Sequence, residues 1–167
     1  MRKKVITLTL VALVALCLSA CGGGDTTSPE GTDAQETEAA EQVDTTSGTI
    51  DKKYDVTIGD ATFGTDYEGK KMIVVHYSFA NNSEEAATPL WSIGTKAFQN
   101  GVELEVAIGM DSSTYDSGTC QKELKPGASL DDCQIAYVLE DDSDVTFEVS
   151  KLFSSKADLT KTFTVAQ

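Results

Sequence analysis

The chain has 167 residues, enough for one ordinary domain with accessory segments, and its formal net charge is −14. Arg2, Lys3 and Lys4 lie in a segment that we expect to be removed, which leaves ten lysines against 27 acidic residues and a net charge of −17. A nucleic-acid-binding protein needs a basic surface to neutralise phosphates. The composition therefore excludes nucleic acid as a partner. It also predicts that membrane attachment comes from covalent lipid rather than from charge.

Residues 1–20 predict a signal peptide. A basic start is followed by the apolar run Val5–Leu18, which is shorter than a typical membrane span, and then by small residues before Cys21. The sequence Leu18-Ser19-Ala20-Cys21 resembles the bacterial lipobox, in which the cysteine thiol is acylated and the preceding bond is cut. An ordinary signal peptide with a chance cysteine is the alternative. We expect Cys21 to anchor the protein in the cell membrane, on its extracellular face, because two acyl chains hold a protein stably.

Residues 21–50 form a different kind of segment. It is rich in Gly, Ser, Thr and Ala, and from Gly22 to Ile50 it carries seven acidic residues, no basic residue and no aromatic residue. Such a segment cannot bury enough apolar surface to offset its ordering entropy. We expect a disordered linker that spans about 30 Å and holds the domain away from the bilayer.

Residues 51–167 predict an all-β domain of seven to eight short strands. Apolar residues alternate in Tyr54–Ile58, resume out of phase at Ala61 as at a bulge, and alternate most clearly from Ile73 to Phe79 before Asn81-Asn82-Ser83. Further strands are expected at Val145–Val149 and Leu159–Val165. This spacing favours an immunoglobulin-like antiparallel sandwich of two sheets, and an OB-like barrel is the alternative.

A hairpin is predicted at Asn100-Gly101, because a type I′ turn needs two residues that tolerate positive φ. A two-residue loop there places Lys96 opposite Glu105, a favourable pair of charges. On the other face the register pairs Ala97 with Leu104, Thr95 with Val106, Ile93 with Ile108, and Trp91 with Met110.

A second hairpin is predicted at Pro126-Gly127. Pairing outward from this turn places Cys120 directly opposite Cys133 in a pair with closely spaced Cα atoms. Because exported proteins keep disulfides, we expect these cysteines to be bonded. Two reduced, buried cysteines are the alternative.

Three segments resemble a family of Gram-positive surface lipoproteins with a C-terminal domain of unknown function. They are Lys71–Asn82, Ala97–Leu104 with its Phe-Gln-Asn-Gly run, and Leu124–Gly127 leading into Ala136–Leu139. The resemblance implies an immunoglobulin-like sandwich similar to small secreted mycobacterial antigens. It implies no reaction and no ligand, so it supplies no catalytic residue.

The polar candidates are His76 and the acidic loop that contains Asp141, Asp142 and Asp144. Carboxylates in one loop suit a hard cation such as calcium, but the loop lacks the glycine and final glutamate of an EF-hand, so a solvated turn is the alternative. His76 has no second histidine and no free cysteine with which to form a zinc site, and a Ser-His relay is also poorly supported. We expect a structural or solvent-facing histidine, and no cofactor.

Tyr115 and Trp91 are the candidate ligand-binding aromatics. Tyr115 lies in the polar loop 111–118, and loops on a rigid sandwich often carry recognition. Trp91 is either an exposed platform for sugar or protein or, by its register with Ile93, a core residue.

These features predict a monomeric, non-enzymatic surface module that binds a protein or an envelope polymer through loops or a sheet edge. A calcium-dependent binder that uses the acidic loops is one alternative. An extracellular hydrolase is the other, although one histidine leaves little from which to build a catalytic site.

Overall fold

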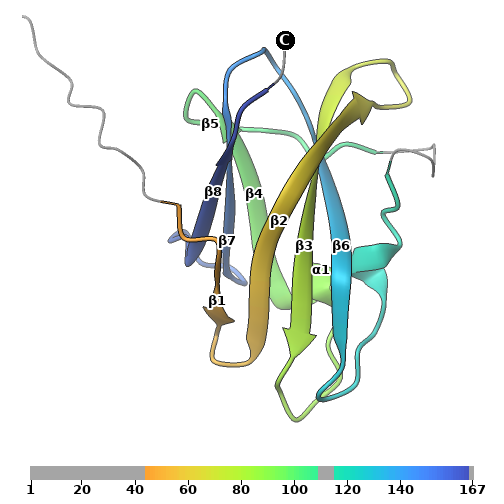
Figure 1. The fold of residues 1–167 in the computed structure, drawn as a ribbon, viewed down its shortest axis with the longest axis vertical. Helices are drawn as coiled ribbons and strands as arrows, with labels where there is room; N and C mark the ends of the chain where they lie inside the picture. Colours follow the sequence, from red (N-terminus) through yellow and green to blue (C-terminus); the bar gives the residue numbers. More distant parts are fainter. Residues whose placement is uncertain (1–43, 109–114, 166–167) are drawn as a thin grey trace, which may run out of the picture. The chain divides into compact units, whose positions relative to one another are not determined.

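The computed structural model describes residues 44–108 and 115–165, which form two antiparallel sheets of four strands each (Figure 1). The strand order is β1-β2-β3-β6 in sheet 1 and β5-β4-β7-β8 in sheet 2. The elements are β1 (Ser47–Ile50), β2 (Tyr54–Thr65), β3 (Lys71–Asn81), α1 (Pro89–Ser92), β4 (Ile93–Gln99), β5 (Val102–Glu103), η1 (Thr119–Gln121), β6 (Ser129–Val138), β7 (Val145–Lys151) and β8 (Leu159–Phe163). The predicted two-sheet sandwich of seven to eight strands is confirmed, and the sheets do not close into a barrel.

The predicted bulge in β2 is also confirmed. The register between β2 and β3 shifts between Ile58 and Ala61, at Gly59-Asp60. A Cβ atom at Gly59 would lie 3.0 Å from the backbone oxygen of His76. Glycine is needed here because the two strands approach each other so closely.

The main core lies between the sheets and follows the alternation in the sequence. Ile73, Val75 and Phe79 of β3 have almost no exposed surface. Tyr137 of β6 meets Phe147 of β7 edge to face, with ring centroids 6.1 Å apart. This aromatic contact joins the two sheets at the centre of the core.

A second, smaller core lies on the outer face of sheet 1. Met72, Val74 and Ala136 pack there against Ala107 and Tyr115. The uninterrupted apolar run at the start of β3 therefore lies in a part of the strand that is buried on both faces.

Two segments pass from one sheet to the other and pair with strands of both. Thr45 pairs with Thr160 of β8, and the next residues form β1 on the edge of β2. At the other side, β5 pairs with β4, and Val106 then pairs with Tyr137 of β6. These crossings occupy edges that would otherwise present unpaired backbone groups.

The hairpin at Asn100-Gly101 is confirmed near its turn. Both residues have positive φ, 51° and 79°, as a type I′ turn requires, and Gln99 pairs with Val102. The predicted pair of Ala97 and Leu104 is joined by a 2.8 Å backbone hydrogen bond.

The register predicted farther from this turn is wrong. After Leu104 the chain leaves β4 for β6, so β5 covers only the last part of β4, whereas β7 pairs along the other edge of β4. The predicted pairs Thr95–Val106 and Ile93–Ile108 therefore do not form, and Trp91 belongs to α1, whereas Met110 lies outside the described residues. The charge partner of Lys96 is Glu103, at 2.7 Å, rather than Glu105.

The turn at Pro126-Gly127 forms, but the hairpin predicted around it is wrong. The amide of Ala128 donates to the carbonyl of Lys125 at 3.0 Å, and Gly127 has a φ of 78°, as in a type II turn. Beyond the turn, β6 pairs with the long strand β3, and Cys133 lies opposite Tyr77. The preceding segment forms η1 instead of a strand, because β3 offers a longer apolar partner than this short polar segment does.

The sheet also begins earlier than the boundary that we predicted at Asp51. Ser47–Ile50 form β1, and the Ile50 side chain is only 1% exposed. This strand was not predicted because Ser-Gly-Thr shows no apolar alternation. It is held by backbone pairing to β2. Among the described residues, no helix has the length and hydrophobicity needed to cross a membrane.

Removing β1 should therefore destabilise the domain. We expect a chain that begins at Asp51 to lose at least about 2 kcal/mol of unfolding free energy relative to one that begins at Asp44, because it loses a buried isoleucine and a strand. Urea denaturation measures the difference. Equal midpoints for the two chains would contradict the role given to β1.

Candidate functional site

A buried amide organises the loop that follows β3. The side-chain nitrogen of Asn81 donates to the carbonyl oxygens of Glu85, at 2.8 Å, and Leu124, at 3.0 Å. Its side-chain oxygen accepts hydrogen bonds from the backbone amide and the hydroxyl of Ser83, at 3.0 and 2.7 Å. Both ends of the amide are satisfied, so the loop 82–86 is held in one conformation. We call this end of the sandwich the Asn81 end.

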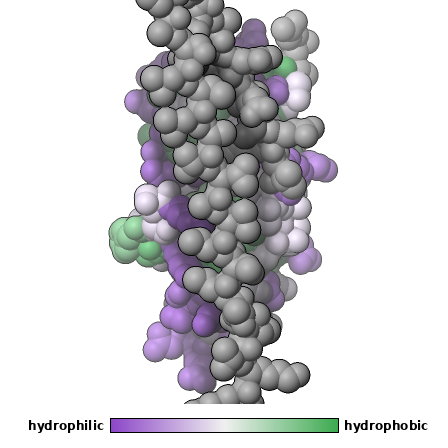
Figure 2. Space-filling view, turned by 90° about the vertical axis from the view of Figure 1, so that its left-hand side faces the viewer, coloured by the Kyte–Doolittle hydropathy of each residue, from purple (hydrophilic) through white to green (hydrophobic). Residues whose placement is uncertain are grey.

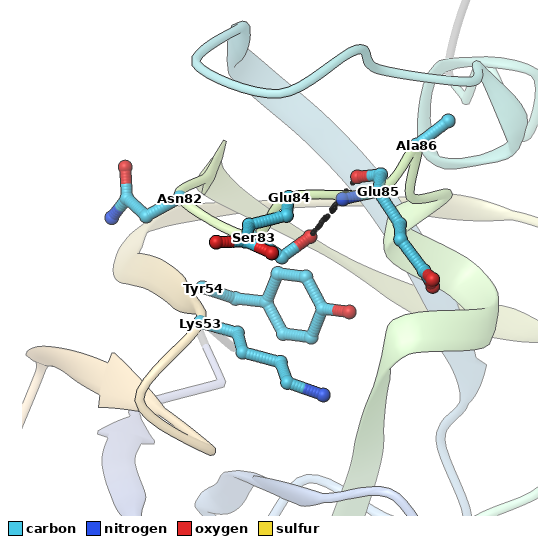
Figure 3. Close-up of a pocket in the computed structure, with 7 residues that line it drawn as sticks. All are labelled: Lys53, Tyr54, Asn82, Ser83, Glu84, Glu85 and Ala86. Carbon is cyan, nitrogen blue, oxygen red and sulfur yellow. Dashed lines mark hydrogen bonds between the residues drawn. The ribbon is translucent and has the colours of Figure 1, made fainter.

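The fixed loop forms one wall of a cleft of about 430 Å³ (Figure 3). Lys53 and Tyr54, at the start of β2, form the opposite wall, and the Tyr54 ring stacks on Phe79 with centroids 5.1 Å apart. In Figure 3 the Tyr54 hydroxyl, the Lys53 ammonium and the Glu85 carboxylate point toward the same side of the cleft. The cleft thus offers hydrogen-bond donors and acceptors beside an aromatic ring.

A hydrogen-bond network fixes the outer rim of the cleft. Asp55 accepts hydrogen bonds from the Thr49 hydroxyl, at 2.6 Å, and from the Asn82 side-chain amide, at 2.7 Å. These two bonds lower the pKa of the Asp55 carboxyl. The ion pair between Lys53 and Asp51 is 3.7 Å long and half exposed, so it adds little stability and leaves the lysine available.

A second buried amide, Gln99, plays the same part at the opposite end of the sandwich. Its nitrogen donates to the carbonyl oxygens of Asp141, at 3.1 Å, and Ser143, at 2.8 Å. Its oxygen accepts from the backbone amides of Glu140, at 2.9 Å, and Asp141, at 3.4 Å. The loop between β6 and β7 is therefore held at its base by the Gln99 side chain.

The acidic residues of that loop, where we predicted a metal site, make hydrogen bonds and ion pairs within the protein. Asp141 accepts hydrogen bonds from Ser143 and from the Asn100 side chain, and its pKa is lowered by the bonds from Ser143. Asp142 forms an ion pair with Lys71 at 2.7 Å. Within the described residues, Asp144 included, no three acidic, histidine or cysteine side chains are placed to hold a metal ion. The carboxylates stabilise the turn rather than gather around a cation.

His76 joins three strands on the outer face of sheet 1. Its Nδ1 lies 2.7 Å from a carboxylate oxygen of Asp132, and its Nε2 lies 3.3 Å from the Thr62 hydroxyl. Burial alone would raise the pKa of Asp132, but the hydrogen bonds from His76 and Gln134 lower it overall.

This order of carboxylate, imidazole and hydroxyl could move a proton. Hydrolysis would also require oxyanion donors and a substrate cleft. Neither His76 nor its two partners line the cleft at the Asn81 end, or a second cleft at the Gln99 end between Phe63, Met72 and Leu139. The three side chains are best explained as a structural contact that links β2, β3 and β6.

Of the two aromatic candidates, Tyr115 is buried and Trp91 is exposed. Tyr115 is 7% exposed and belongs to the small outer core, and burial raises its pKa to about 12. This burial does not favour the predicted ligand-binding role. Trp91 is 72% exposed in α1, so its predicted packing in the core is wrong and its role as an exposed platform is open to test.

The two cysteines are free in the structure, and both are buried. The backbone amide of Gln134 donates to the Thr119 hydroxyl at 2.9 Å. This hydrogen bond holds η1, which contains Cys120, against β6. Burial and the nearby Cys120 raise the pKa of the Cys133 thiol to about 12, and burial also raises the pKa of Cys120. The predicted disulfide is thus absent, although the fold brings the two residues near each other by a route other than the predicted hairpin.

Sequence reasoning missed Asn81 and Gln99 as organising residues. The signal was present, because Asn81 continues the inward alternation of β3 and Gln99 continues that of β4. A polar residue at an inward position has to be hydrogen-bonded within the protein.

Comparisons with known proteins agree with this fold. Residues 28–151 match a family model described as "Domain of unknown function (DUF5067)". A Staphylococcus aureus protein named a "putative lipoprotein" is 18% identical with a TM-score of 0.55, over 68% of this chain and 84% of its own. A protein from Enterococcus faecalis is 18% identical with a TM-score of 0.51, over 72% of this chain and 94% of its own. At this identity the likeness extends to the fold alone, and no curated protein matches the chain.

The buried thiols should be unreactive in the folded protein. At pH 8 we expect Cys120 and Cys133 to resist iodoacetamide, because both are protonated and shielded, and both to react once the chain is unfolded without reductant. Mass spectrometry of the peptides distinguishes them. An unfolded, unreduced chain with neither thiol alkylated would contradict the structure and restore the disulfide.

Proposed function

The chain belongs to the DUF5067 family, and from this premise we propose that it is a lipid-anchored surface protein whose sandwich binds a protein or an envelope polymer. The binding site in this proposal is the cleft formed by Lys53, Tyr54 and the loop 82–86. The module is non-catalytic and contains no cofactor.

The observation that carries the proposal is the fixed geometry of the cleft. The Asn81 side chain makes four hydrogen bonds that order the loop 82–86 before any partner binds. Asp55 accepts a hydrogen bond from Asn82 at the rim of the cleft. A loop that is already ordered loses little entropy when it binds. Recognition by loops on a rigid sandwich is also common.

Charge and edge pairing narrow the class of partner. The mature chain of this proposal has a net charge of −17, so a polyanionic polymer would be repelled and a neutral or cationic partner is favoured. Binding by addition of a strand is poorly supported. Residues 45–50 pair at the edges of β2 and β8, and residues 102–106 pair at the edges of β4 and β6.

The anchor rests on Cys21 and its lipobox. A neighbour in fold that is named a lipoprotein supports a membrane-anchored protein, and the signal sequence supports the extracellular face. Residues 22–43 would then connect the lipid to the sandwich.

An immunoglobulin-like topology is part of the proposal. If β2 is counted as the first strand, the orders β2-β3-β6 and β5-β4-β7-β8 correspond to A-B-E and C′-C-F-G of an immunoglobulin sandwich, which supports it. In this comparison β1 is an additional strand at the edge of β2.

Site-specific photo-cross-linking on intact cells tests the binding site. A photoreactive side chain in place of Glu84, which is exposed in the cleft loop, should capture one discrete partner, and the same group in place of Glu140 at the other end should not. Adding Lys53→Ala and Glu85→Ala should reduce the yield at position 84 at least fivefold. Equal capture from both positions, or capture that ignores these two substitutions, would contradict the proposed cleft.

A further inference from the structure

Two exposed aromatic side chains lie at the same end of sheet 2. β4 and β7 pair with Ile93 opposite Lys151. Trp91 lies two residues before Ile93, in α1, and Phe153 lies two residues after Lys151, in the turn that leads to β8. The register brings the start of β4 beside the end of β7, so the two side chains project from the same end of sheet 2, although they are 62 residues apart in the sequence.

These side chains are exposed to an unusual degree. Phe153 is 97% exposed, Trp91 72% and Leu152 41%. We call these three residues the aromatic patch. In Figure 2 the described part of the surface is largely hydrophilic and carries one compact hydrophobic projection at its left edge.

Phe153 is also held in an unfavourable backbone conformation. Its φ is 62°, in the region that favours glycine, and the turn is closed by a 2.9 Å hydrogen bond from the amide of Ser154 to the carbonyl of Lys151. A bulky residue at such a position is strained. Since the ring is almost fully exposed, packing within the described chain does not compensate for this strain.

The charge around the patch differs from that of the whole protein. Lys151 and Lys156 flank the turn, and neither forms an ion pair with another described residue. The one acid of the turn, Asp158, accepts a hydrogen bond from the backbone amide of Lys151. Aromatic and aliphatic side chains beside unpaired lysines are typical of surfaces that lie in the interface of an anionic bilayer.

The N-terminal segment joins the domain beside this turn. Asp44 accepts a hydrogen bond from the amide of Thr162, and Thr45 pairs with Thr160, in the strand that directly follows the turn. Only residues 22–43 separate Asp44 from the proposed acylated Cys21. A linker of that length with the disorder predicted from its composition would span about 26 Å, so the lipid anchor would keep the patch at high local concentration near the bilayer.

We infer that the aromatic patch docks on the surface of the membrane in which the protein is anchored. This inference rests on the proposed lipid anchor and goes beyond it, since it gives the anchored domain a preferred orientation. The cleft lies at the same end of the sandwich, so docking would place its partner close to the membrane.

Trp91 is the only tryptophan of the chain and therefore reports on the patch directly. The lipidated, full-length mature protein is reconstituted into phosphatidylglycerol–phosphatidylcholine vesicles with brominated acyl chains, and Trp fluorescence is measured. We expect bromolipid to quench Trp91 at least twofold. A matched control, Trp91→Phe with Tyr67→Trp, moves the probe to the β2–β3 turn at the Gln99 end and should show no quenching.

Phe153→Gly separates docking from folding. Glycine suits the positive φ, so this variant should melt at the same or a higher temperature than the parent, while quenching of Trp91 falls by at least half. Replacing Lys151 and Lys156 with Gln should weaken quenching in anionic vesicles more than in purely zwitterionic ones.

Four results would overturn the inference. Protein that floats with the vesicles but shows no quenching of Trp91 rejects docking alone, as does equal quenching of the control probe. A blue shift of Trp91 that depends on protein concentration without vesicles assigns the patch to a second copy of the chain. Protein that behaves like Cys21→Ser and fails to float rejects the lipid anchor, and docking with it.

Discussion

The structure depends on satisfying two amides that lie at inward-facing positions of the sandwich. Asn81 ends β3 and Gln99 ends β4, and each side chain uses both its oxygen and its nitrogen to hold a loop of the same chain. An unpaired amide at a buried position would cost about 1–3 kcal/mol per lost partner, so the loops have little freedom to move away. One amide shapes the wall of the cleft, and the other fixes the acidic turn. The most specific motif of the sequence, Phe-Gln-Asn-Gly, is thereby explained as structural chemistry.

Much of the fold follows from local patterns in the sequence. Alternation identified β2, β3, β7 and β8, and the phase slip at Gly59-Asp60 identified the bulge, because these patterns report directly on which face is buried. The Asn100-Gly101 turn was predictable because few residues tolerate its backbone angles.

The errors have a common physical cause. In two places the chain could either continue a local hairpin or pair with a distant strand. Beyond Leu104, Val106 pairs with Tyr137 of β6 instead of with β4. Around Pro126, β6 pairs with β3 instead of with the segment before the turn. Such choices depend on tertiary contacts that no short window contains. The burial of Tyr115 and the exposure of Trp91 were not predictable for the same reason, because Tyr115 is covered by contacts with strands that are distant in the sequence.

The candidate site was less predictable than the fold. Lys53, Tyr54 and the loop 82–86 come from two separate parts of the chain, and none carries a motif of its own. Their arrangement depends on Asn81, which the sequence shows only as the end of a strand. By contrast, Cys21 remains a prediction from sequence alone. An ordered cleft, a patch of exposed aromatics and a proposed lipid anchor together describe a binding module that works close to a membrane.

The most direct test of this account is the pH dependence of stability in Gln99→Glu. The carboxylate cannot donate to the carbonyl oxygens of Asp141 and Ser143, so we expect a loss of about 3 kcal/mol relative to the parent at pH 7. Burial beside carbonyl oxygens raises the pKa of such a glutamate above its unfolded value, so the loss should shrink as pH falls toward 4.5, where the protonated acid regains a donor. Gln121→Glu removes one exposed hydrogen bond to the Ser117 carbonyl and should lose much less stability than Gln99→Glu at pH 7, because water can replace that bond. A Gln99→Glu protein as stable as the parent at pH 7, or one whose deficit grows as pH falls, would contradict the account.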